Sequence, residues 1–220
     1  GKLMASGKLK FLLVVSLAAM MWNVWQVRAA TYYVSPEGTD GNAGTEDSPW
    51  SLEKANGTAE PGDVIVLLDG VYTTSIAPDR SGTAGSPIVY QTQKRRGARF
   101  NNAFSSSAAV ILDDRSHVVV DGIESIGVHR WVLGVGAGDI VIQNSHFEDS
   151  SGWESMRFRD SQGRITVSNC HIQNGTDSLH IRSGENHLVE DNVFVDATHT
   201  CLVLMAVKRS VVRGNRLSNL

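Results

Sequence analysis

A repeat of a little over twenty residues governs the second half of the chain. A short β-type phrase recurs five times between residues 109 and 220, and its fourth member is in turn Asp121, Ser145, Cys170, Asn192 and Asn215. These positions are 24, 25, 22 and 23 residues apart. A unit this short cannot bury its own apolar face, so neighbouring units must stack and share one core.

A second phrase follows the same period, at residues 131–133, 156–158, 179–181 and 202–204. In stacked coils, each strand lies parallel to the strand one coil earlier at about 4.8 Å, and side chains alternate between the interior and solvent. Small or amide side chains at one recurring position suit the ladders that stacked strands form. We therefore predict an all-β fold, a single-stranded right-handed parallel β-helix. Leucine-rich repeats share the length, but their leucine and asparagine consensus is absent.

The first thirty residues differ from the rest of the chain. Basic residues precede an apolar run at 11–21, and the small residues Ala29 and Ala30 follow it. This order is typical of a cleaved secretory signal peptide, and the run is short of the about 20 apolar residues that a retained membrane anchor needs. We therefore predict a signal peptide at 1–30, a β-helix domain at 31–220, and a secreted or periplasmic protein without a stable membrane anchor.

The charge of the chain and its cysteine content limit which partners and which disulfide are expected. Without residues 1–30 the chain carries 16 Lys and Arg against 23 Asp and Glu, a formal charge of −7, which argues against nucleic acid. Cys170 and Cys201 are expected to be small buried residues rather than a disulfide. We expect a monomer. Because Leu220 falls on a strand phrase with no polar cap after it, we also expect an amino-terminal part of a longer protein.

The region before the repeats predicts short elements. Strands are expected at 31–34, 64–68, 71–73 and 88–91, and a short helix at 51–57 begins with Ser51 and ends with Gly57. The same region carries a set of turn and strand motifs, which are YYVSP at 32–36, GT at 44–45, SPW at 48–50, PGD at 61–63, GVY at 70–72 and GTAGSPI at 82–88.

These motifs resemble the amino-terminal region of secreted bacterial β-helix proteins of the pectate-lyase-like superfold, in particular the family of alginate lyases and chondroitinase B. The resemblance covers residues 31–92, and the later coils match only by pattern. It implies that the short helix caps the open end of the β-helix, and that the substrate is an acidic polysaccharide cleaved by β-elimination.

Cationic side chains gather on two of the predicted strands. With Met156 and Phe158 facing the core, Arg157 and Arg159 face outward; with Leu179 and Ile181 facing the core, His180 and Arg182 face outward. The common spacing of 23 stacks Arg157 on His180 and Arg159 on Arg182. Like charges in register destabilise a sheet by about 0.2–1 kcal/mol, so carboxylates or an anionic ligand must compensate.

Two interpretations of this cationic face remain open. In one, Glu154, Asp160 and Asp177 at the strand edges neutralise the arginines on a solvated surface. In the other, the face is a groove for an acidic polysaccharide, in which arginine or a calcium ion neutralises the uronate carboxylate and His180 acts as the base. The predicted catalytic residues are therefore His180, Arg182, Arg157, Arg159, Glu154 and Asp177.

The family resemblance implies particular site residues. The family carries an Arg-His-Gly phrase with an active-site arginine, and Arg182-Ser183-Gly184 stands here with Ser for His. The family also has two calcium-binding glutamates and a lysine base. Only Glu154 matches one of those acids, Asp160 stands near the place of the lysine, and the lysine itself is missing.

A glycoside hydrolase and a non-catalytic carbohydrate-binding β-helix are the alternatives. Glu154 and Asp177, 23 residues apart, would lie about 5 Å apart on adjacent coils, a separation suited to retaining glycosidases. Trp153 is a candidate for stacking on a sugar, with Asp160 as a second substrate-binding residue. His146 and His171 form another outward column, but two histidines alone are weak metal ligands.

Overall fold

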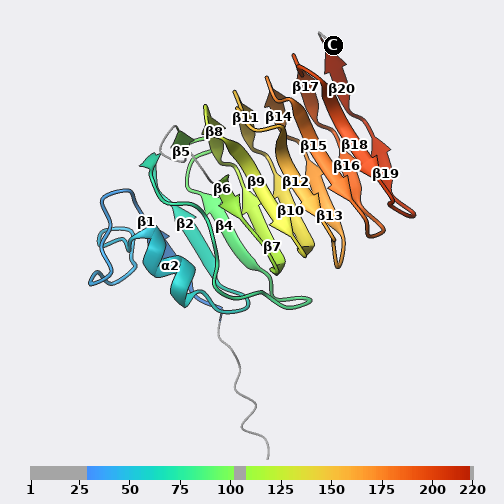
Figure 1. Cartoon of the computed structure of the whole chain (residues 1–220). Helices are drawn as coiled ribbons and strands as arrows, with labels where there is room; N and C mark the ends of the chain where they lie inside the picture. The colour runs from blue at the N-terminus through green and yellow to red at the C-terminus, as the bar shows by residue number, and fades with distance from the viewer. Residues whose placement is uncertain (1–28, 102–107, 219–220) are drawn as a thin grey trace, which may run out of the picture.

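The chain forms a parallel β-helix. The computed structural model describes residues 29–101 and 108–218, so nearly all of the predicted signal peptide lies outside it. Successive coils stack along one axis, from α2 at the amino-terminal end to the final strands at the other (Figure 1). Every pairing between its named strands is parallel, as the repeat predicts. Within these two ranges, no helix has the length and apolarity needed to cross a membrane.

Three sheets run along the helix, and each regular coil contributes one strand to each of them. Sheet 1 consists of β1 (Thr31–Val34), β2 (Val64–Leu67), β4 (Ile88–Thr92), β7 (Ser116–Asp121), β10 (Gly138–Gln143), β13 (Ile165–Ser168), β16 (Leu188–Glu190) and β19 (Val211–Arg213). Sheet 2 consists of β3 (Gly70–Tyr72), β5 (Ala98–Asn101), β8 (Glu124–Ile126), β11 (His146–Glu148), β14 (His171–Gln173), β17 (Val193–Val195) and β20 (Arg216–Ser218). Sheet 3, which carries the cationic strands, consists of β6 (Ala108–Ile111), β9 (Arg130–Val135), β12 (Glu154–Arg159), β15 (Asp177–Arg182) and β18 (Thr200–Met205).

The helix α2 (Leu52–Thr58) closes the amino-terminal end of the core. Ser51 caps it, because its hydroxyl oxygen accepts a hydrogen bond from the backbone N–H of Lys54 at 3.0 Å. Leu52 and Ala55 are buried in the same core as Ile65 of β2. The predicted capping helix is confirmed, one residue later than the sequence places it.

A left-handed residue makes the sharp turn from sheet 1 to sheet 2 in each of the five coils that contain β7, β10, β13, β16 and β19. Backbone φ lies between 53° and 82° at this position. Glycine, asparagine and aspartate tolerate this conformation best, which explains why they recur at the repeat period. The residues in this column are Gly122, Asn144, Asn169, Asp191 and Gly214.

The residue after each of these turns belongs to a ladder of inward side chains. Asn192 is fully buried; its side-chain oxygen accepts from the N–H of Cys170, and its amide donates to the carbonyl of Val167, each at 2.9 Å. Asn215 accepts from the backbone N–H of Asn192 in the same way. Cys170 and Cys201 are free and buried, as predicted. The predicted ladder is therefore confirmed over its later coils.

The predicted alignment of the first repeat is wrong by two residues. Val120, and not Val118, pairs with Ile142. Ile123 therefore occupies the ladder position in place of Asp121, and its N–H donates to the Ser145 hydroxyl at 3.2 Å. The shift escapes detection in the sequence because Val118 and Val120 both face inward, and a slip of two residues preserves the apolar pattern.

The second phrase is also misaligned in its first coil, by one residue. Met156 pairs with Val132 and Phe158 with Gly134, so Leu133 lies beside Arg157 on the outer face. A Cβ on Gly134 would lie 2.8 Å from the Phe158 ring, and this glycine therefore makes room for the phenylalanine. A slip of one residue exchanges the two faces of a strand.

We predict that Asn192→Ala lowers the free energy of unfolding by about 3 kcal/mol, because it leaves the Cys170 N–H and the Val167 carbonyl buried without partners. Arg213→Ala is the control. Arg213 forms an exposed ion pair with Glu190, and its loss should cost less than about 1 kcal/mol. Equal costs in urea unfolding would contradict this role of the ladder.

His187 predicts a loss of stability in acid. It is 1% exposed, its Nδ1 accepts from the N–H of Ile165 at 3.1 Å, and its Nε2 lies 2.9 Å from the Ser183 carbonyl. Burial lowers the pKa of His187, so the unfolded chain binds the extra proton first. Unfolding free energy should therefore fall as pH drops below about 6.5. His187→Asn should flatten part of that slope in urea titrations, and an unchanged slope would contradict the assignment.

Candidate functional site

A break in strand alternation places two acids on the outer face of sheet 3. At the start of β12, Ser155 and Met156 are both fully buried although they are consecutive. The ladder between β12 and β15 pairs Glu154 with Asp177 and then skips to the second residue beyond each. Glu154 thus shares the outer face with the arginines, whereas strict alternation from Met156 would turn it inward.

The cationic side chains of β12 and β15 gather around the carboxylate of Glu154. It is 6% exposed, and its Oε1 lies 2.6 Å from Nη2 of Arg159. Its Oε2 lies 3.7 Å from Nη1 of Arg157. The ring of His180 approaches within 3.0 Å through Nδ1, although this contact does not have the direction of a hydrogen bond. One carboxylate thus faces two guanidinium groups and an imidazole.

Arg130, which the sequence reasoning missed, joins this group from the preceding coil. Burial is the main cause that lowers the pKa of Arg130; the charges of Arg157 and Arg159 add to the effect and Glu154 opposes it. The Nε atoms of all three arginines are buried and have no hydrogen-bond partner among the described residues. We call Arg130, Glu154, Arg157, Arg159 and His180 the arginine cluster. It holds more positive charge than its single carboxylate neutralises.

The predicted stacking holds in part of this surface. Arg157 pairs with His180, as expected from the spacing of 23. Arg182 lies two residues after His180 on the same strand, is exposed, and pairs across the sheet with Met205. No described acidic group forms an ion pair with Arg182, so its guanidinium is available to solvent.

Two predicted substrate-binding residues have different surroundings. Asp160 occupies a left-handed turn position, with φ of 52°, and forms no ion pair with an arginine in the described part of the chain. The left-handed backbone conformation explains why an aspartate occupies this position. The expectation that Asp160 neutralises the arginines is not met. Trp153 is 64% exposed at the edge of sheet 3, directly before Glu154.

Asp177 is bound by a histidine that the sequence reasoning did not single out. Asp177 is 5% exposed, and its Oδ1 lies 2.7 Å from Nδ1 of His199. The His199 ring also lies against Trp153, with ring centroids 5.3 Å apart. The spacing of 22 residues from Asp177 is the available sequence signal, because it places His199 at the same edge one coil later.

The donor set does not fit the calcium ion that the family resemblance implies. Glu154, the acid in the matching position, is neutralised by Arg159 and approached by His180. Asp177 accepts from His199. Calcium takes six to eight oxygen ligands, and this surface offers two carboxylates that are already engaged.

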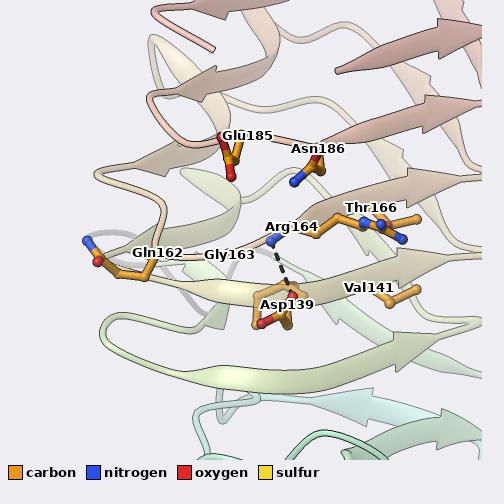
Figure 2. A pocket seen from close by; sticks show the side chains of 9 residues that line it. Asp139, Val141, Gln162, Gly163, Arg164, Thr166, Glu185 and Asn186 are labelled. Atoms are coloured by element: carbon orange, nitrogen blue, oxygen red, sulfur yellow. Dashed lines mark hydrogen bonds between the residues drawn. The ribbon is translucent and has the colours of Figure 1, made fainter. Parts of the chain in front are cut away.

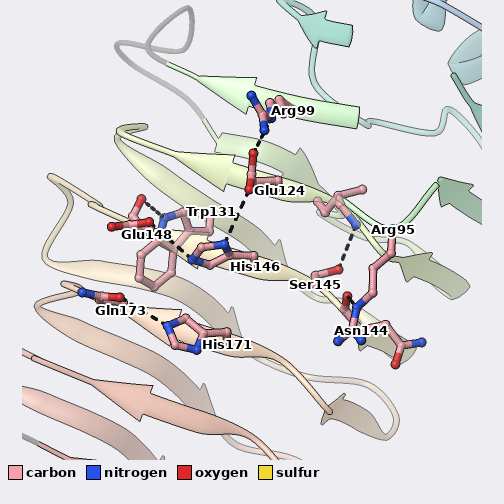
Figure 3. A network of polar contacts seen from close by, with 11 residues as sticks. Arg95, Arg99, Glu124, Trp131, Asn144, Ser145, His146, Glu148, His171 and Gln173 are labelled. Atoms are coloured by element: carbon pink, nitrogen blue, oxygen red, sulfur yellow. Dashed lines mark hydrogen bonds and ion pairs between the residues drawn. The ribbon is translucent and has the colours of Figure 1, made fainter. Parts of the chain in front are cut away.

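Sheet 2 carries a separate polar network, shown in Figure 3. His146 pairs with His171, which confirms the predicted outward column. The ring nitrogens of His146 lie 3.6 Å from Glu124 and 3.4 Å from Glu148, and burial lowers its pKa. Across residues 29–101 and 108–218, no group of three or more His, Cys, Asp or Glu side chains is placed to hold a metal ion.

A hollow of about 430 Å³ lies at the turns that enter sheet 1, and none of the residues that line it belongs to the arginine cluster (Figure 2). Asp139, Arg164 and Glu185 are among the residues that line it. The backbone N–H of Arg164 donates to Asp139 at 3.3 Å. The hollow brings together few groups of catalytic type, so we assign the candidate site to sheet 3 on its chemistry and not on the size of a cavity.

Comparison with known proteins now adds to this geometry. The family model described as a Pel9A-like, right-handed β-helix region matches residues 32–187. The crystal structure of pectate lyase Pel9A superposes with a TM-score of 0.55 at 17% identity, over 76% of this chain and 54% of that one. At this identity the likeness concerns the fold.

Two curated relatives match shorter parts of the chain. Pectate lyase PEL9 of Emericella nidulans is 46% identical over 66 residues, 29% of this chain and 16% of its own length. Pectate lyase L of Dickeya chrysanthemi is 35% identical over 85 residues, 34% of this chain and 20% of its own length. The chain therefore spans a small part of these relatives.

We predict that Glu154→Gln lowers the free energy of unfolding by about 3 kcal/mol, because the arginines lose the carboxylate that compensates their partly buried charge. Added salt should recover part of the loss by screening. Glu190→Gln, which disturbs only the exposed pair with Arg213, should cost less than about 1 kcal/mol in the same urea titrations. A smaller effect at Glu154 than at Glu190 would contradict the balance of charge described above.

Proposed function

The chain belongs to the family of Pel9A-like right-handed β-helix proteins, and on this premise we propose that it processes an acidic, uronate-containing polysaccharide by β-elimination. The observation that carries the proposal is the arginine cluster. Two guanidinium groups, those of Arg157 and Arg159, contact the carboxylate of Glu154, and Arg130 adds a third positive charge beside them, so the cluster holds more positive charge than Glu154 neutralises.

The chemistry of elimination requires such a cluster. The proton at C5 of a uronate is acidic only when the adjacent carboxylate is neutralised, since charge develops on it as the proton leaves. Arginine's planar fork binds a carboxylate through two parallel hydrogen bonds and stabilises that charge. The positive charge of the cluster exceeds what Glu154 neutralises, so a bound carboxylate would also stabilise the protein.

Arg157, Arg159 and Arg182 are proposed to bind substrate carboxylates, and Trp153 to stack on a sugar ring. His180 is not proposed to contact the substrate. Both of its ring nitrogens are buried, so a substrate proton cannot reach them directly. We therefore assign His180 to the arginine cluster, where it packs against Glu154, and not to proton abstraction.

A glycoside hydrolase is the second candidate, because Glu154 and Asp177 are partners on adjacent strands. A retaining glycosidase needs one protonated carboxyl group as acid and one free carboxylate as nucleophile. Here Glu154 contacts Arg159 at 2.6 Å and Asp177 contacts His199 at 2.7 Å. Both carboxylates are therefore already engaged, one by a guanidinium group and one by an imidazole, which favours the lyase over the hydrolase.

The cellular location is part of the same proposal. A polymeric uronate substrate lies outside the cytoplasm, and the basic and apolar pattern of residues 1–30 is typical of a secretory signal peptide. A non-catalytic carbohydrate-binding role would use the same exposed Trp153 and arginines, and only a product assay separates it from catalysis.

We predict that the protein releases unsaturated ends, which absorb in the ultraviolet, from polygalacturonate or alginate. Arg157→Met and Arg159→Met should each lower kcat/KM by about 10²–10³-fold, because each removes a group that stabilises developing charge. Arg213→Met, on sheet 1, is the control and should leave activity unchanged.

Three results would separate the candidates. New reducing ends without ultraviolet absorbance would indicate hydrolysis. Binding to these polymers without any product would indicate a binding protein. Full lyase activity in both cluster variants would remove the arginine cluster from the mechanism.

A further inference from the structure

We propose that His199, oriented by Asp177, is the base that removes the C5 proton in this reaction. The inference rests on the proposed elimination and adds to it the proton acceptor that the arginine cluster lacks. Neither residue pattern nor family resemblance pointed to His199; the contact with Asp177 does.

The contact with Asp177 selects one tautomer of the neutral His199 ring. Its Nδ1 lies 2.7 Å from the Asp177 carboxylate, which can only accept, so Nδ1 carries the proton and donates it. The hydroxyl oxygen of Thr200 lies 3.1 Å from the same nitrogen. Nε2 then carries the lone pair of the neutral ring. No described residue forms a hydrogen bond with Nε2.

A catalytic base must be open to the substrate, and the residue that orients it can be buried. Asp177 and His199 differ in exposure in this way. The Asp177 side chain is 7% exposed and the His199 side chain is 58% exposed. The carboxylate is therefore held in the protein while the imidazole faces solvent. His180 shows the opposite arrangement, since its side chain is 10% exposed and its ring nitrogens are covered.

The dyad adjoins the arginine cluster. Asp177 pairs directly with Glu154 across β12 and β15, at one coil spacing of about 4.8 Å. The His199 ring leans back onto Trp153, which immediately precedes Glu154. A uronate stacked on Trp153 would thus lie next to the imidazole of His199 and one residue away from Glu154, which the guanidinium groups contact. This arrangement places proton removal and carboxylate neutralisation at the same edge of sheet 3.

The step balances without an oxidant or a further reactant. Nε2 forms a bond to the C5 proton as the C5–H bond breaks, and that electron pair forms the C4–C5 double bond. The C4–O4 bond breaks, and the leaving glycosidic oxygen takes a proton from water. The imidazolium then returns its own proton to solvent. Asp177 stabilises the imidazolium and is a positioning residue.

The test compares two substitutions at His199 in the full chain with polygalacturonate or alginate. His199→Asn keeps an N–H donor for Asp177 but removes the proton acceptor, and should lower kcat by about 10²–10⁴-fold with a much smaller change in KM. His199→Ala should regain activity when imidazole is added, because the position is open to solvent. His129→Asn, a histidine at the same edge of an earlier coil, should leave activity unchanged.

Asp177→Asn adds a readout that does not depend on turnover. In ¹⁵N spectra of the neutral ring, His199 should be protonated at Nδ1 in the wild-type protein and should lose this preference in Asp177→Asn. A wild-type ring protonated at Nε2 would overturn the proposal, since no lone pair would then face the substrate.

The outcomes separate this inference from the function on which it rests. Active wild type with an unimpaired His199→Asn variant would overturn only the role of His199. Wild type that yields no unsaturated ends would overturn both the elimination and its base. Loss of activity in His199→Ala that imidazole does not rescue would indicate a structural role and would also overturn the proposal.

Discussion

The register between successive coils holds all three sheets and the candidate site in place. Each strand of a coil finds its hydrogen-bond partners in the coils before and after it, so one displaced coil would disturb all three sheets at once. The ladder at Asn192 and Asn215 strengthens this register, because each amide satisfies backbone groups of neighbouring coils. Apolar layers inside the coils supply most of the driving force, at about 1.5–3 kcal/mol for each large buried side chain.

The same register creates the candidate site. Residues 22 to 24 apart in the chain become lateral neighbours, which concentrates three arginines, two acids and two histidines at one edge of sheet 3. A surface of this kind is costly without a ligand, since partly buried guanidinium groups share one carboxylate. The rigid coil therefore holds charges in an arrangement that an anionic sugar polymer complements. The exposed histidine adds a proton acceptor at the same place.

The period in the sequence predicts the β-helix and the pairing of Arg157 with His180, because a constant coil length is enough to derive them. The helix is predicted from Ser51 at its start and Gly57 at its end, and its capping role from the family resemblance. The period does not predict the first coil of either phrase. Two inward valines hide a slip of two residues at Val118, and a pair of consecutive buried residues hides a slip of one at Trp131. A corresponding pair of consecutive buried residues in β12, Ser155 and Met156, turns Glu154 outward, on the same face as Arg130 of β9. Strand alternation alone contains no information on such a break, so Arg130 emerges only from the structure. For His199 the spacing of 22 residues from Asp177 is the available sequence signal, and the contact between the two side chains comes from the structure.

A crystal structure with a bound uronate oligosaccharide would show whether the arginine cluster binds a sugar carboxylate. We expect a sugar carboxylate within hydrogen-bond distance of guanidinium nitrogens of Arg157 or Arg159, with a sugar ring against Trp153. An oligosaccharide bound elsewhere on the coil, or at this edge with its carboxylates turned to solvent, would contradict this expectation.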